Sequence, residues 1–71
     1  MFIKFIHQNG KKRQTKVNSI PDFDELRLLA IKIWGESVRN CLFGYIDSDE
    51  ELITIVNQDD WEVCVEELES L

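Results

Sequence analysis

The chain has 71 residues, a hydrophobic fraction of 44% and a formal net charge of −6. This size allows one domain, near the lower limit for folding on a hydrophobic core alone. No apolar stretch approaches the roughly 20 residues that span a bilayer, and the N-terminus lacks the layout of a signal peptide. We therefore expect a single cytoplasmic domain over residues 1–71 that does not bind membranes.

The N-terminal segment predicts a β-hairpin. Residues 2–6 (FIKFI) are rich in β-branched and aromatic side chains, as strands are. Asn9-Gly10 suits the positive φ angles of a tight turn, and residues 13–19 are expected to return as the second strand. Lys4 lies inside the first strand, where a lysine is disfavoured unless its ammonium group reaches solvent or a partner.

A helix is predicted over residues 22–34. Asp22 and Glu25 have the spacing of a capping box. Apolar residues then recur every three or four positions, which gives one apolar stripe. Gly35 is well placed to end the helix in a left-handed conformation.

The second half predicts another hairpin and a shorter helix. Residues 42–46 and 52–56 have the composition of strands, and an acidic turn separates them. Residues 59–69 carry an apolar stripe at helical spacing, and Asn57 can cap this helix. The predicted element order is therefore ββαββα.

This order indicates an α+β domain of the ubiquitin-like β-grasp class, in which a mixed sheet packs on the long helix. Such sheets usually have one further strand after the second helix, and the sequence contains no segment for it. The residues expected to form the core are Ile3, Phe5, Val17, Phe23, Leu26, Ala30, Ile33, Ile53 and Ile55.

Charge is divided unevenly along the sequence. Residues 1–40 hold eight basic and four acidic residues, a net charge of +4, whereas residues 41–71 hold ten acidic residues and no basic one. An asymmetry of this kind indicates an interaction surface rather than a particular fold.

The acidic spacing Asp47-x-Asp49-x-Glu51 resembles the opening of a calcium-binding loop. That loop requires Gly at its sixth position and a bidentate Glu at its twelfth. The sequence has Leu52 and Gln58 there, so a dedicated calcium site is disfavoured. Weak cation binding by the acidic loop stays an alternative.

Other ligand and enzyme classes also fit poorly. His7, Cys41 and Cys64 lack the spacing of a zinc site, and the three glycines are isolated rather than arranged as a phosphate-binding loop. No serine has the surroundings of a catalytic nucleophile. We therefore expect no metal, no cofactor and no enzymatic activity.

The charged residues allow two simpler explanations. Glu66, Glu67 and Glu69 are expected to form the solvated outer face of the last helix. The basic hairpin residues suggest a nucleic-acid patch, but the acidic half would repel phosphates. Neither explanation accounts for the acids of the turn and of residues 59–60, which a hairpin followed by a helix is expected to bring together.

The sequence "YIDSDEELITIVNQDDW" resembles the acidic motif of the PB1 (Phox and Bem, also written PB-1) domain, an interaction module with a ubiquitin-like β-grasp fold. That motif has an aromatic residue, alternating acids, an apolar strand and a second acidic group. Gln58 departs from it, because the family often has Asp there. The resemblance implies these acidic partner-binding residues: Asp47, Asp49, Glu50, Glu51, Asp59 and Asp60.

The hairpin "IKFIHQNGKKRQTKV" resembles the basic face of the same family, and is most similar to that of mitogen-activated kinase kinase kinases. The family places a Lys in the first strand and Arg or Lys at the start of the second. The resemblance implies that Lys4, Lys12 and Arg13 are the basic partner-binding residues.

With both surfaces present, the resemblance implies a protein–protein interaction module of the dual class. Such a module binds another PB1-type domain, or itself, front to back and head to tail in signalling scaffolds. The alternative is a ubiquitin-like domain that binds partners through an apolar sheet surface. This alternative predicts that binding is insensitive to salt.

Overall fold

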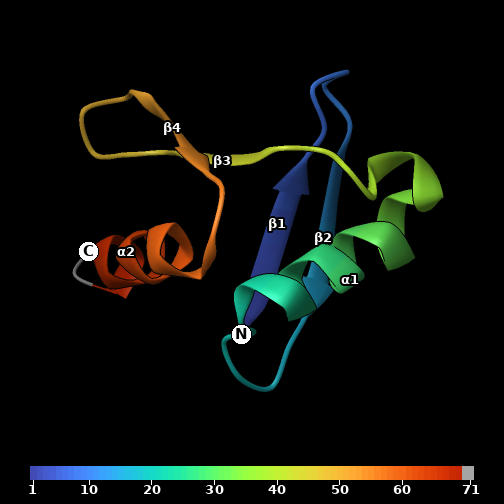
Figure 1. Cartoon of the computed structure of the whole chain (residues 1–71), viewed down its shortest axis with the longest axis horizontal. Helices are drawn as coiled ribbons and strands as arrows, with labels where there is room; N and C mark the ends of the chain where they lie inside the picture. Colours follow the sequence, from blue (N-terminus) through green and yellow to red (C-terminus); the bar gives the residue numbers. More distant parts are fainter. Residues whose placement is uncertain (70–71) are drawn as a thin grey trace. The chain divides into compact units, whose positions relative to one another are not determined.

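The computed structural model describes residues 1–69. The chain divides into two compact units, with the boundary in the sequence between Arg39 and Asn40. Each unit contains a β-hairpin and an α-helix (Figure 1). The predicted order ββαββα is confirmed, with one additional short 3-10 helix, η1. The first unit holds β1 (Phe2–Ile6), β2 (Lys12–Lys16), α1 (Phe23–Trp34) and η1 (Glu36–Val38); the second holds β3 (Phe43–Ile46), β4 (Leu52–Ile55) and α2 (Gln58–Glu69).

The β1–β2 hairpin is antiparallel, with Phe2 opposite Lys16 and Ile6 opposite Lys12. The predicted second strand, residues 13–19, is wrong at both ends. It begins one residue earlier and stops at Lys16, although the backbone N–H of Val17 still donates to the carbonyl oxygen of Met1 at 2.9 Å beyond the end of the strand.

The turn of this hairpin is wider than the predicted two-residue turn. The backbone N–H of His7 donates to the carbonyl of Lys11 at 2.8 Å, which leaves three residues between them. Only Gly10 has a positive φ, 91°. The Asn9 side chain instead accepts a hydrogen bond from the backbone N–H of Lys11 at 2.9 Å, which holds the turn without a left-handed Asn.

The prediction for helix α1 is confirmed at its N-terminus. The Asp22 carboxylate accepts the backbone N–H of Glu25 at 2.8 Å, and the Glu25 carboxylate accepts that of Asp22 at 3.5 Å, which forms the predicted capping box. Gly35 has the expected positive φ of 91°, but its ψ of −179° is extended rather than left-handed helical, as the chain turns into η1. The buried face of α1 consists of Phe23, Leu26 and Ala30.

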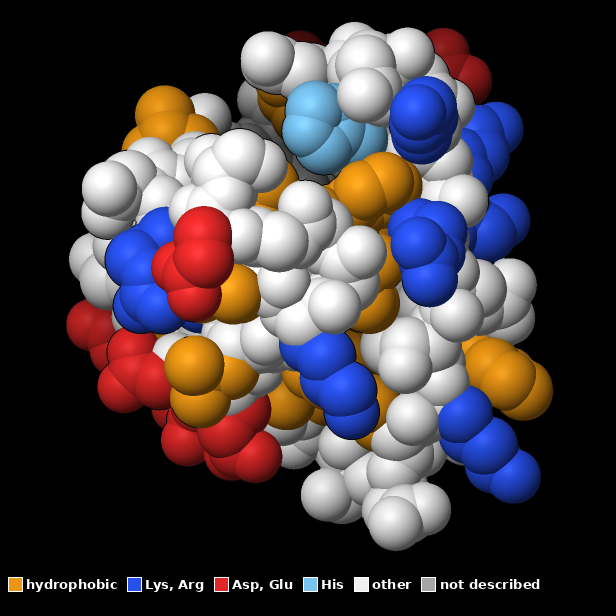
Figure 2. Space-filling model, turned by 90° about the vertical axis from the view of Figure 1, so that its right-hand side faces the viewer, with side chains coloured by type: hydrophobic (Ala, Val, Ile, Leu, Met, Phe, Trp, Pro, Cys, Tyr) orange, Lys and Arg blue, Asp and Glu red, His pale blue; other side chains and the backbone are white. Residues whose placement is uncertain are grey.

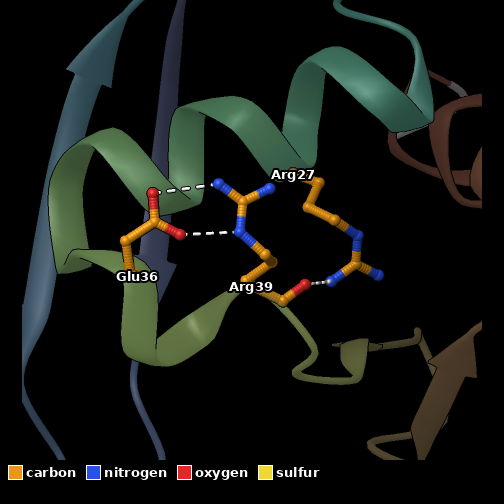
Figure 3. A network of polar contacts seen from close by, with 3 residues as sticks. All are labelled: Arg27, Glu36 and Arg39. Atoms are coloured by element: carbon orange, nitrogen blue, oxygen red, sulfur yellow. Dashed lines mark hydrogen bonds and ion pairs between the residues drawn. The ribbon is translucent and has the colours of Figure 1, made fainter.

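Helix η1 is fastened to α1 by a polar network (Figure 3). Arg39 pairs with Glu36 through Nε–Oε2 at 2.6 Å and Nη2–Oε1 at 2.9 Å. The guanidinium of Arg27 in α1 donates to the carbonyl oxygen of Arg39 at 2.8 Å. These contacts hold the segment that buries Val38, a core residue absent from the sequence prediction.

In the second unit, the β3–β4 hairpin is antiparallel and pairs Phe43 with Ile55 at its open end. This pair limits both strands to one residue less than predicted. At the other end Ile46 pairs with Leu52. Gly44 is closely packed, because a Cβ there would lie 3.1 Å from the carbonyl oxygen of Ile53.

Helix α2 covers one face of this hairpin, and it starts one residue earlier than predicted. Its predicted cap is confirmed, because the side-chain oxygen of Asn57 accepts the backbone N–H of Asp60 at 2.9 Å. The buried core residues of this unit are Ile55 from β4 and Trp61 and Cys64 from α2.

The first unit contains the two-stranded antiparallel sheet β1–β2, and the second contains the two-stranded antiparallel sheet β3–β4. These hairpins and the two α-helices confirm the predicted α+β class. No helix in this part of the chain is long and apolar enough to cross a membrane. Of the predicted core, Phe23, Leu26, Ala30 and Ile55 are buried, whereas Ile3, Phe5, Val17, Ile33 and Ile53 are half-buried.

Candidate interaction surfaces

The acidic turn between β3 and β4 is organised by one of its own carboxylates. The backbone N–H of Asp47 donates to the carbonyl of Glu51 at 3.0 Å, and that of Glu50 donates to the carbonyl of Asp47 at 3.0 Å. One carboxylate oxygen of Asp47 accepts the backbone N–H groups of Asp49 and Glu51, both at 2.9 Å. The half-buried Asp47 therefore shapes the turn as well as contributing charge.

The other acids of this turn point their charge into solvent. Asp49, Glu50 and Glu51 are all exposed. Glu50 has a φ of 63°, in the left-handed region that side chains other than glycine rarely adopt. Three exposed carboxylates on three consecutive residues give the turn a dense negative charge.

The second acidic group lies at the start of α2. The Asp60 carboxylate accepts the backbone N–H of Val56 at 3.0 Å, so Asp60 helps to fix the entry into the helix. Asp59 is exposed, and both acids lie where the helix dipole is positive. Gln58, the residue that departs from the family pattern, donates from its amide to Glu62 at 3.5 Å along the helix.

The two acidic groups lie at opposite ends of β4 rather than side by side. Strand β4 spans Leu52–Ile55. The acidic turn precedes this strand, and Asp60 accepts a hydrogen bond from Val56, the residue that follows it. At about 3.3 Å per residue, Glu51 and Val56 are separated by about 17 Å along the strand. The two groups therefore form an elongated surface, and a single lysine cannot contact both.

Tyr45 links the acidic turn to the other end of α2. Burial, followed by a hydrogen bond to Glu67, raises the pKa of the Tyr45 phenol to about 12, and the charge of Asp47 adds to the shift. Glu67 is exposed, as predicted, and its carboxylate additionally contacts the Tyr45 phenol. Because α2 runs back along the hairpin, its C-terminal turn is the part that meets β3, and this pairing follows from topology rather than from the acidic motif.

The basic face is the outer face of the β1–β2 hairpin. Residues directly opposite each other share a face, and the register pairs Lys4 with Gln14, Ile6 with Lys12 and Phe2 with Lys16. Lys4, Lys12 and Lys16 therefore lie on one face, and all are exposed. Figure 2 shows Lys and Arg side chains gathered along one side of the surface that it displays.

Lys16 was not among the predicted site residues. The sequence signal was present, because Lys12 and Lys16 are four residues apart in a strand and must share a face. Their separation is about 13 Å at ~3.3 Å per residue, a few ångströms less than the distance of about 17 Å between Glu51 and Val56. The sequence does not reveal the pairing register of β1 with β2, and this register places Lys12 and Lys16 on the same face as Lys4.

Arg13 lies on the opposite face of the hairpin. It pairs with Phe5, and its guanidinium carbon lies 6.0 Å from the ring centroid of Trp34 in α1. The ring of His7 packs on the same indole, with 5.2 Å between centroids. Arg13 therefore contributes a cation–π contact within the first unit, and the structure does not group it with Lys4.

These surfaces contain no metal-binding arrangement. Within residues 1–69, no group of three or more His, Cys, Asp or Glu side chains is placed to hold a metal ion. The acids instead accept backbone hydrogen bonds or face solvent, an arrangement suited to binding a cationic surface.

Comparison with protein families gives one match, to the model of the PB1 domain, which covers residues 1–71. Comparison with curated proteins and with solved structures gives no match. The family consists of protein–protein interaction domains with a ubiquitin-like β-grasp fold, and PB1 domains bind one another. The chain belongs to the PB1 domain family.

Proposed function

We propose that this domain, residues 1–71, docks front to back with PB1 domains, including other copies of itself. Its acidic surface binds the basic face of one partner, and its basic face binds the acidic surface of another. A chain with both surfaces builds head-to-tail assemblies, which suits a cytoplasmic signalling scaffold. No step of this function requires a cofactor or catalysis.

The observation that carries this proposal is the separation of charge between the two units. The first unit contains all eight basic residues and has a net charge of +4, and the second contains ten acids and no base. Each unit presents its charge on a β-hairpin, at Lys4 and its neighbours in one and at the Asp47–Glu51 turn in the other.

The proposed contacts follow the spacing of the two surfaces. Lys4 of one molecule lies among Asp49, Glu50 and Glu51 of the next. A second cation reaches Asp59 and Asp60; we place Lys12 in this role. Arg13, which is an exposed residue, stays a predicted contributor.

Energetics favour a cluster over isolated ion pairs. A single exposed pair contributes only ~0–1 kcal/mol. Hydrogen bonds to charged groups contribute about 1.5–3 kcal/mol each, and binding also relieves the repulsion between neighbouring carboxylates. Because charges beyond ~8 Å are screened at physiological ionic strength, the association should form quickly and weaken with salt.

The test is light scattering of wild type, Lys4→Ala and Asp49→Ala over a range of salt and protein concentration. Each variant lacks one surface, so each should be monomeric alone, and an equimolar mixture should stop at a dimer. Matched controls are Lys32→Ala on α1 and Glu66→Ala on α2, which are exposed residues outside both surfaces. If Lys4→Ala and Asp49→Ala assemble as wild type does, the proposal is refuted.

A further inference from the structure

An exposed apolar pair lies directly behind the acidic turn. Ile46 and Leu52 form the last cross-strand pair of the β3–β4 hairpin, and the chain passes from them straight into Asp47 and Glu51. Their side chains are 62% and 72% exposed. A partner that reaches the acidic turn therefore meets these two apolar side chains at the same place.

The basic face has the corresponding feature around Lys4. Phe2 and Ile6 are two residues before and after it on the same face of β1, each about 7 Å away along the strand. They are 63% and 65% exposed. Large apolar side chains are scattered singly on most protein surfaces, but here they flank the charged centre of both proposed surfaces.

We propose that Ile46 and Leu52 of one molecule pack on Phe2 and Ile6 of a second copy of this chain, beside the contact of Lys4 with the acidic turn. This inference rests on the proposed front-to-back docking and adds an apolar contact to it. The occupant is a second copy because the chain carries both complementary charges, and the apolar pairs lie at the same places as those charges.

This arrangement gives the assembly two parts with different responses to salt. The charged contacts weaken as ionic strength rises. Apolar burial does not, and strongly hydrated salts such as sulfate strengthen it. A residual association should therefore persist in high salt and should increase when sulfate replaces chloride at equal ionic strength.

The experiment uses the capped dimer of the Lys4→Ala and Asp49→Ala variants, because each interface then forms only once. Leu52→Thr is added to the Lys4→Ala chain, whose acidic surface is used, and Ile6→Thr to the Asp49→Ala chain. Threonine keeps the β-propensity of both strands. Leu28→Gln in either chain is the control, since Leu28 lies on α1 and is 63% exposed. Calorimetric titration at low and at high salt gives the Kd.

Each threonine variant should raise the Kd about tenfold at both salt concentrations, in line with partial loss of an apolar side chain. The Leu28→Gln control should change it less than twofold. The two threonine variants together should weaken binding by less than the product of their separate effects, because residues in contact are not additive. Melting curves of each chain check that the variants are folded.

The outcomes separate this inference from the function on which it rests. If the parent chains form the dimer but Leu52→Thr and Ile6→Thr bind like the Leu28→Gln control, the apolar contact is refuted and front-to-back docking stands. Multiplicative effects of the two threonines would also refute direct packing. If the parent chains do not bind even in low salt, both the docking and the contact fail.

Discussion

Removal of the Asp47 carboxylate should destabilise the fold as well as the acidic surface. One oxygen of Asp47 accepts two backbone N–H groups of the turn, from Asp49 and Glu51, at 2.9 Å each. Asp47→Ala leaves both N–H groups without that acceptor. Asp49→Ala removes an exposed carboxylate that accepts no such bond, so it is the matched control.

The magnitude follows from the similarity to a helix N-cap, where a side-chain oxygen accepts backbone N–H groups. Loss of such a cap costs about 0.5–2 kcal/mol, typically ~1. Water can replace part of the bonding because the turn is at the surface. We therefore expect Asp47→Ala to lower the free energy of unfolding by about 1–2 kcal/mol, and each 1 kcal/mol should lower Tm by about 4–8 °C in a domain of this size.

Urea denaturation and thermal melts in low and high salt measure this effect. Asp47→Asn should recover most of the stability, because its amide oxygen can accept the same bonds, although it removes the charge. Asp49→Ala should be neutral, or slightly stabilising in low salt, because it relieves repulsion. Equal losses for Asp47→Ala and Asp49→Ala would show that the turn does not depend on this carboxylate. Equal losses for Asp47→Ala and Asp47→Asn would show that the charge of Asp47 matters rather than an acceptor oxygen alone.

Three further predictions come from single residues. Glu50→Gly should raise the free energy of unfolding by about 0.5–1 kcal/mol by relieving the left-handed φ of 63°. Tyr45, the only tyrosine, should titrate by ultraviolet absorbance near its raised pKa of about 12. The unfolded chain loses that proton first, near pH 10, so stability should fall as pH rises between those values, and Glu67→Gln should shift the titration downward. Cys64 is 2% exposed and burial raises the pKa of its thiol, so it should resist alkylation until the domain unfolds.

Much of the secondary structure could be predicted because its signals are local. The capping box of Asp22 and Glu25 and the cap at Asn57 each involve residues three apart, and both are confirmed. Strand ends were less accurate, because the partner strand determines them. Residues 13–19 looked suitable for a strand, but the ladder pairs Lys16 with Phe2 and ends there.

The sequence names candidate site residues but does not determine how they are arranged. Lys4 and Lys12 share a face, whereas Arg13 is directed to the other face and Lys16 joins the first. A shift of one residue in register reverses every such assignment, and no local pattern states the register. The contact of Tyr45 with Glu67 was missed for a similar reason. It depends on where the end of α2 returns along the hairpin, which is a property of topology.

The two hairpins contain the same kind of turn, and the comparison bears on Glu50. In both turns the first residue accepts the backbone N–H of the third through its side chain, His7 in one and Asp47 in the other. In both, the fourth residue has a positive φ: Gly10 at 91° and Glu50 at 63°. The first turn shows that glycine suits this position without strain.

A glutamate in that position costs of order 1 kcal/mol in backbone strain. Strain of this kind tends to lie where a side chain has a role in binding, and Glu50 carries its charge at the centre of the proposed acidic surface. Glu50→Gly should therefore move stability and binding in opposite directions, with a higher Tm and weaker docking. Glu50→Gln retains the strain and removes the charge, so it should weaken docking while leaving Tm nearly unchanged. If Glu50→Gly raises Tm and docks as tightly as wild type, Glu50 contributes only to the shape of the turn.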